Sequence, residues 1–239
     1  ARSEPAAGRR RALIEEAKKL FNDGLGAARS DPFAYLGLSY IKRQEYLAES
    51  NPGKRQSLLI EAISLLEQGR EVTERPDVLE REYARLKDEL GERREAIEAL
   101  GQALKRDPAN GRVRDLYVTY LTDEGRIDDA LKAARTGIKH APTSWRLFRH
   151  AARLLFRSGA STEIIREQFE AAIRNNRRNP DLLVELGSVL FVRGEQEEAI
   201  RVFRRGYDVC STAQEKQMVR AWWRDESGEK RLFSGEVSR

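Results

Sequence analysis

The feature that most constrains the fold is a repeat of about 34 residues. Four glycines keep this spacing, at steps of 34, 34 and 35 residues: Gly91, Gly125, Gly159 and Gly194. Two further sets repeat nearly the same steps, namely Leu100, Ala134, Phe169 and Phe203, and Ala103, Gly137, Ala172 and Gly206. Three positions in one register indicate a row of similar structural units that stack on their neighbours.

Each unit contains a small–large–small trio whose members are spaced four and then three residues apart. This spacing places the three side chains on one face of a helix. The trio occurs six times: Ala17, Phe21, Gly24; Ala62, Leu66, Gly69; Ala96, Leu100, Ala103; Ala130, Ala134, Gly137; Ile165, Phe169, Ala172; and Ala199, Phe203, Gly206. We therefore expect six second helices, in which small residues allow close approach and the large residue fills the gap.

An apolar or aromatic residue followed by a smaller one marks the first helix of a pair: Leu36-Gly37, Tyr83-Ala84, Tyr117-Val118 and Leu186-Gly187. The repeat glycines lie between the two helices, where a left-handed turn reverses the chain. Pro108 and Pro142 lie 34 residues apart in the links between units. With 40% hydrophobic and 35% charged residues, the composition favours amphipathic helices, so the chain is predicted to be all-α.

This combination resembles the tetratricopeptide repeat, with an aromatic or Leu before Gly, then Ala, an aromatic, Ala and Pro. The stretch from Pro180 to Ser211 matches that pattern almost throughout. The resemblance implies a right-handed α-solenoid of about five helix pairs over residues 12–211, with an N-terminal half-repeat and a C-terminal capping helix at 212–226. The stretch 1–11 is expected to be a linker.

Two departures from the period are visible. Arg153 is interpreted as taking the small-residue position of the fourth complete unit, where the helix containing Trp145 is expected to begin early, similar to the half-tetratricopeptide variant of RNA-processing scaffolds. Upstream, Leu36-Gly37 precedes Tyr83-Ala84 by 47 residues, 13 more than one period. The excess falls around Glu49 to Arg55, where Asn51-Pro52-Gly53 predicts a loop or a broken helix end. A tolerated insertion is favoured over a contact loop.

The last stretch, residues 227–239, is predicted to be a linker followed by the first strand of a truncated β domain. Its alternating pattern from Leu232 to Arg239 is similar to the start of a cold-shock or OB-fold domain. That order of domains resembles large multidomain signalling and defence ATPases, so the chain is expected to be a fragment of a longer protein.

Residues that could support catalysis are scarce. His140 and His150 are the only histidines and have no metal-site spacing, while Cys210 is the only cysteine, and the glycines are explained by turns and helix crossings. We therefore expect no enzyme activity, no cofactor and no metal. The single cysteine and the lack of an apolar run of membrane-spanning length predict a cytoplasmic protein without a membrane segment.

Arginine-rich faces are the remaining candidates for a binding site. Arg146, Arg149, Arg153 and Arg157 follow one helical face, and so do Arg81 and Arg85. A solvated face and a ligand surface are about equally supported by this pattern. Because first helices line the inner wall of such solenoids, the resemblance implies a partner-binding set made of Arg81, Arg85, Asp115, Thr119, His150 and Arg157. A protein or peptide of acidic character would suit it.

Two functions follow from these observations. The first is a non-catalytic protein–protein interaction scaffold or sensor. The alternative is nucleic-acid binding through the arginine faces, suggested by a pI of 9.4. The 39 acidic residues interspersed among 44 basic ones weaken any long-range field, which places the alternative second.

Overall fold

The computed structural model describes residues 4–227, and within that range every regular element is an α-helix. Contacts divide the chain into two compact units, 1–120 and 121–239, with the boundary inside α6. The helices that begin in the first unit are α1 Glu4–Ala27, α2 Pro32–Ala48, α3 Pro52–Val72, α4 Asp77–Glu89, α5 Arg93–Arg106 and α6 Gly111–Asp123. The second unit contains α7 Ile127–His140, α8 Trp145–Arg157, α9 Thr162–Asn175, α10 Pro180–Val192, α11 Gln196–Asp208 and α12 Ala213–Ser227. This is the predicted order of a half-repeat, five pairs and a final helix.

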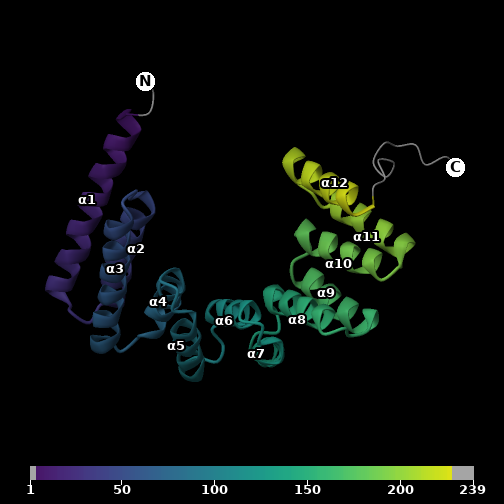
Figure 1. Cartoon of the computed structure of the whole chain (residues 1–239), viewed down its shortest axis with the longest axis horizontal. Helices are drawn as coiled ribbons and strands as arrows, with labels where there is room; N and C mark the ends of the chain where they lie inside the picture. Colours follow the sequence, from purple (N-terminus) through teal and green to yellow (C-terminus); the bar gives the residue numbers. More distant parts are fainter. Residues whose placement is uncertain (1–3, 228–239) are drawn as a thin grey trace. The chain divides into compact units, whose positions relative to one another are not determined.

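The first unit contains two helix hairpins, with α2 beside α3 and α4 beside α5 (Figure 1). Leu66 of α3 and Leu79 and Leu86 of α4 are fully buried and form the centre of its core. The unpaired helix α1 packs on α2. The ring of Phe21 lies directly against Gly37 and fills the space that a side chain at this position would need. α1 begins at Glu4, so the helix includes most of the stretch predicted to be a linker.

The helix break predicted around Asn51-Pro52-Gly53 is present between α2 and α3, but most of the additional residues lie in the helices rather than in a loop. α2 has 17 residues and α3 has 21, whereas α4 and α5 have 13 and 14. The 13 additional residues therefore mainly lengthen both helices. Asn51 caps α3 by accepting a hydrogen bond from the Lys54 amide at 3.1 Å, and Pro52 is its first residue. Asn-Pro-Gly is a turn between two long helices here, because asparagine suits the N-cap and proline the first helical position.

In the second unit, the two phenylalanines of the register are buried as predicted, Phe169 at 1% and Phe203 at 0% exposure. The Phe203 ring lies against Gly187, where an added Cβ would come within 2.8 Å of it. The last helix, α12, covers this core with Val219, while Trp222 is exposed. Glu215 caps α12 by accepting hydrogen bonds from the Ser211 and Thr212 amides. The predicted β strand at 232–239 lies outside the described residues.

The helix-reversing turns confirm the role of the repeat glycines. Positive φ angles occur in the described residues only at Gly91, Gly125, Gly159 and Gly194, at 91°, 74°, 77° and 85°. L-residues with a side chain rarely adopt these angles, so the turn selects glycine.

The fourth complete unit needs a correction of one residue. Ala152, fully buried, occupies the small-residue position, whereas Arg153 is exposed. α8 begins at Trp145, 34 residues after the start of α6, so it does not begin early. The register is hard to recognise in the sequence here, because Ala151 stands where the other units have a leucine or tyrosine before the small residue.

Candidate partner-binding surface

Arg81 and Arg85 lie one turn apart on α4, as predicted. Arg81 is half-buried and forms no ion pair with the described residues, while the Arg85 side chain is 41% exposed. The Arg85 Nη1 atom lies 3.7 Å from Oε2 of Glu82, a residue of the same helix. The two arginines therefore form the accessible cationic part of α4, and Glu82 is the anion nearest to Arg85.

Glu82 is an unusual neighbour because its carboxylate is buried without a hydrogen bond. The residue is 1% exposed, and both carboxylate oxygens lack a partner among the described residues. Arg43 of α2 approaches it only to 3.8 Å. Burial raises the pKa of Glu82, and the charges of Arg43 and Arg85 oppose this increase without cancelling it. A carboxyl group that resists ionisation neutralises Arg85 less than a solvated glutamate would.

The second predicted pair lies on α6. Asp115 and Thr119 are half-buried, and the Thr119 hydroxyl donates to the Asp115 carbonyl at 2.9 Å. The next residue, Tyr120, connects this helix to the α4–α5 pair: the Arg93 guanidinium stands 5.5 Å from its ring, and burial and Asp88 raise the pKa of its phenol. Thr119 thus makes a hydrogen bond within its own helix and is a poorer ligand group than Arg81 or Arg85.

In the second unit, His150 is half-buried on α8, and Arg157 is exposed in the last turn of this helix. The residues two periods after Arg81 and Arg85 are instead Arg149 and Arg153. The period alone predicts these two positions, because they follow Asp115 and Thr119 by 34 residues each. Assigning the small-residue position to Arg153 instead of Ala152 hid the equivalence of Arg153 with Thr119.

Arg149 and Arg153 converge on Glu185 of α10. Arg149 Nε donates to Oε1 at 2.8 Å, and its Nη2 is bound to the same oxygen. Arg153 Nε donates to Oε2 at 2.8 Å and its Nη2 to Oε1 at 2.7 Å. Burial would raise the pKa of Glu185, but the hydrogen bonds from both arginines outweigh it and lower the pKa. This arginine face is an ion-paired link between two first helices.

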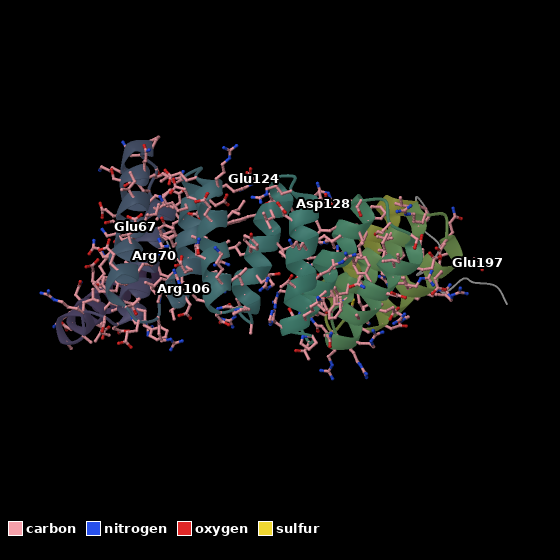
Figure 2. The ribbon with its side chains drawn as sticks, turned by 90° about the horizontal axis from the view of Figure 1, so that it is seen from below. Glu67, Arg70, Arg106, Glu124, Asp128 and Glu197 are labelled. Atoms are coloured by element: carbon pink, nitrogen blue, oxygen red, sulfur yellow. The ribbon has the colours of Figure 1, made fainter. Side chains whose placement is uncertain are left out.

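Other arginines are also paired with carboxylates. Figure 2 shows Arg70 and Arg106, whose guanidinium groups bind the buried Glu80 Oε1 at 3.2 and 3.1 Å. Arg70 also stacks over the Tyr83 ring at 4.2 Å. Such pairs cancel much of the basic charge locally, which explains why a pI of 9.4 does not imply a continuous cationic surface.

The described residues hold no group of three or more His, Cys, Asp or Glu side chains placed to bind a metal ion. Cys210 is buried, and its thiol donates to the Gly206 carbonyl at 3.2 Å. Burial raises its pKa, which disfavours the reactive thiolate. Among the described helices, none is both long and apolar enough to cross a membrane.

Comparison with known proteins identifies the repeat. Residues 166–213 match the family model described as tetratricopeptide repeat. No curated protein gives a significant match.

Among solved structures, yeast Tom70 is similar with a TM-score of 0.66 and 16% identity over 92% of this chain and 45% of Tom70. Pseudomonas aeruginosa pilF gives a TM-score of 0.59 and 18% identity over 94% of this chain and 95% of pilF. YrrB, described as a TPR protein with an unusual peptide-binding site, gives 0.57 and 13% identity over 86% of this chain and all of YrrB.

The fold and the matched repeat define the class of protein. Residues 166–213 are a tetratricopeptide repeat, and the described chain has the all-α solenoid fold of tetratricopeptide-repeat proteins.

Proposed function

We propose that this protein is a non-catalytic scaffold that binds an acidic segment of a partner protein on the first-helix surface carrying Arg81 and Arg85. The observation that carries the proposal is the pairing pattern of the arginines. Arg149 and Arg153 are bound by Glu185. At the equivalent positions of α4, Arg81 forms no ion pair with any residue that the structure describes, and Arg85 faces a carboxyl group whose pKa is raised. Two cations one turn apart suit a partner's carboxylates.

The remaining predicted residues have supporting roles in this proposal. Asp115 and Thr119 would border the α4 site from α6, and His150 and Arg157 would add polar contacts on the separate surface of α8. The peptide-binding site named for YrrB, a protein of the same fold, agrees with a peptide ligand. We also place the protein in the cytoplasm, a proposal that rests on its single cysteine.

The test is a titration of the full chain into a labelled glutamate-rich peptide, at low and at physiological salt. Exchanging Arg81→Glu and Arg85→Glu together should abolish measurable binding, because two attractive contacts become repulsive. A matched control exchanges Arg94→Glu and Lys105→Glu on α5, two exposed cations of the same helix pair. Loss of binding in the α5 variant, with none in the α4 variant, would refute the surface assignment.

The nucleic-acid alternative is tested by the same kind of titration. A labelled single-stranded RNA replaces the peptide, and binding is measured at two salt concentrations. We expect weak binding, because Arg149 and Arg153 are both held by Glu185, which cancels one of their two positive charges and occupies N–H groups of both. Tight binding that falls steeply with salt would favour the alternative over the protein scaffold.

A further inference from the structure

The lengthened α2–α3 hairpin forms a cleft that the ordinary repeat does not have. A first helix normally ends five residues after its small residue, as from Ala84 to Glu89, whereas α2 continues from Gly37 to Ala48. A second helix normally begins three residues before its trio, whereas α3 begins ten residues before Ala62. The additional turns bring new side chains beside the end of α4.

These side chains enclose a cleft of about 340 Å³ within the first unit. Its walls include Tyr46 of α2, Arg55 and Leu59 of α3, and Glu89 and Leu90 at the end of α4. The volume is near the lower end of the range for small-ligand pockets, roughly 300 to 1,000 Å³, and suits one or two side chains. Tyr46 and Arg55 both belong to the lengthened part of the hairpin.

The charges in the cleft are unequally compensated. Glu89 has a cationic partner at one of its two oxygens: Arg43 Nε donates to its Oε1 at 3.0 Å, while its Oε2 is buried without a hydrogen bond from the described residues. Arg55 stacks on the Tyr46 ring, with its guanidinium carbon 4.7 Å from the ring centroid. It forms no ion pair with the described residues, and its Nε is buried without an acceptor. The uncompensated charge of the cleft is therefore the guanidinium of Arg55, held in place by an aromatic ring.

The remaining wall is apolar. Leu59 is 3% exposed and belongs to the core, and Leu90 is half-buried against the same core. An oriented cation beside an apolar wall suits a ligand that carries a carboxylate next to an apolar group. A multiply charged phosphate is a poorer fit, because the Glu89 carboxylate lines the same cleft.

We infer that this cleft binds an acidic residue and the adjacent apolar side chain of a partner peptide. The carboxylate pairs with Arg55, and the apolar side chain packs against Leu59 and Leu90. This inference rests on the proposed function and makes it more specific: the α4 arginines attract an acidic segment, and the cleft selects one that also contains apolar residues. Packing of a side chain adds affinity that charge alone does not supply.

The experiment titrates the isotope-labelled full chain with an amidated peptide in which aspartate and leucine alternate, observed by NMR. Two further peptides carry asparagine for aspartate and alanine for leucine. We expect the first peptide to shift the amide signals of Tyr46, Arg55 and Leu90, and each substituted peptide to bind at least about tenfold more weakly, a factor that corresponds to about 1.4 kcal/mol.

The matched variants are Arg55→Gln and Lys54→Gln, which remove the same charge from adjacent residues of α3. Lys54 is exposed and does not line the cleft. Arg55→Gln should weaken the peptide about tenfold, whereas Lys54→Gln should change its affinity by less than about twofold, since an exposed charge outside the contact is screened. Because the Arg55 side chain forms no ion pair or hydrogen bond with the described residues, and the substitution keeps the backbone bond of Arg55 to Asn51, the variant is expected to remain folded.

The outcomes separate the two proposals. Equal affinities of Arg55→Gln and Lys54→Gln would overturn the cleft assignment, and so would signal shifts confined to other helices. If the alternating peptide does not bind while the glutamate-rich peptide binds through Arg81 and Arg85, the cleft inference is wrong and the proposed function stands. If neither peptide binds, both are wrong.

Discussion

Replacement of Glu185 by glutamine tests whether ion pairing holds neighbouring first helices together. Glu185 accepts hydrogen bonds from Arg149 and Arg153 on α8, and its side chain is 15% exposed. Glutamine preserves the size of the side chain but removes the negative charge and turns one of its two acceptor atoms into a donor. Its NH₂ group would then face guanidinium N–H groups, which are themselves donors.

The expected loss of stability lies between two limits. An exposed ion pair contributes about 0 to 1 kcal/mol, and breaking a fully buried pair costs about 3 to 5 kcal/mol. Arg153 is 49% exposed and regains water easily, so its share is small after screening. Arg149 is 26% exposed and loses most of its compensation. We therefore expect Glu185→Gln to lower the free energy of unfolding by about 2 kcal/mol at neutral pH.

Glu82→Gln is the matched control, since Glu82 also stands two residues before the small residue of its unit. Its carboxylate makes no hydrogen bond and its pKa is raised, so ionisation opposes folding there. We expect Glu82→Gln to be neutral or stabilising at pH 7. Urea unfolding followed by circular dichroism gives both free energies, and hydrogen exchange of the α10 amides localises the first. Equal effects of the two substitutions would refute the reasoning.

The changes in unfolding free energy caused by Glu185→Gln and Glu82→Gln should have opposite signs, and both should diminish at low pH. The folded-state pKa of Glu185 is lowered from its ordinary value of 4.5, so its contribution is complete above that value and is lost as the pH falls through the folded-state pKa. The destabilisation by Glu185→Gln should shrink accordingly in acid. The folded-state pKa of Glu82 is raised, so its unfavourable contribution grows as the pH rises from about 4.5 through the folded-state pKa. The gain from Glu82→Gln should vanish at low pH.

Three further substitutions test the packing. Phe203→Ala removes a fully buried ring and should cost about 3 to 5 kcal/mol in urea unfolding; an effect below about 1 kcal/mol would show that the register is wrong. Gly194→Ala places a Cβ at a φ of 85°, and we expect a loss of about 1 to 2 kcal/mol by thermal unfolding, whereas Gly26→Ala in α1, with open space around it, should have little effect. Asn51→Ala removes the cap of α3 and should cost about 1 kcal/mol, with faster hydrogen exchange confined to its first turn; unchanged exchange there would contradict the capping role.

The order of the helices could be predicted because the period is set by packing requirements that few residues satisfy. A helix crossing as close as Gly187 on Phe203 requires a glycine, and a turn with a positive φ requires another. The length of the α2–α3 hairpin could not be predicted in the same way. Asn51-Pro52-Gly53 fits both a loop and a tight turn between helices, and the flanking residues carry no repeat signature that fixes where the helices end.

The candidate site was less accessible to sequence analysis. The arginines of α4 and α8 occupy equivalent positions. Glu185 forms hydrogen bonds with both arginines of α8, whereas the buried Glu82 only weakly affects those of α4. The two contacts differ in length by only about one ångström: Arg149 Nε lies 2.8 Å from Glu185 Oε1, and Arg85 Nη1 lies 3.7 Å from Glu82 Oε2. A spacing pattern identifies the face but not the partners across it.

The unequal length of the α2–α3 hairpin also has a consequence for assembly during folding. Helices of 13 and 14 residues recur from α4 to α11, so a newly formed hairpin of this size can stack on a neighbour other than its own. Such misassembly is a characteristic failure of repeat proteins. α3, with 21 residues, packs against α2, which has 17 residues and is closer to it in length than any helix from α4 to α11. The long hairpin thus has one matching position in the row, which opposes stacking out of order.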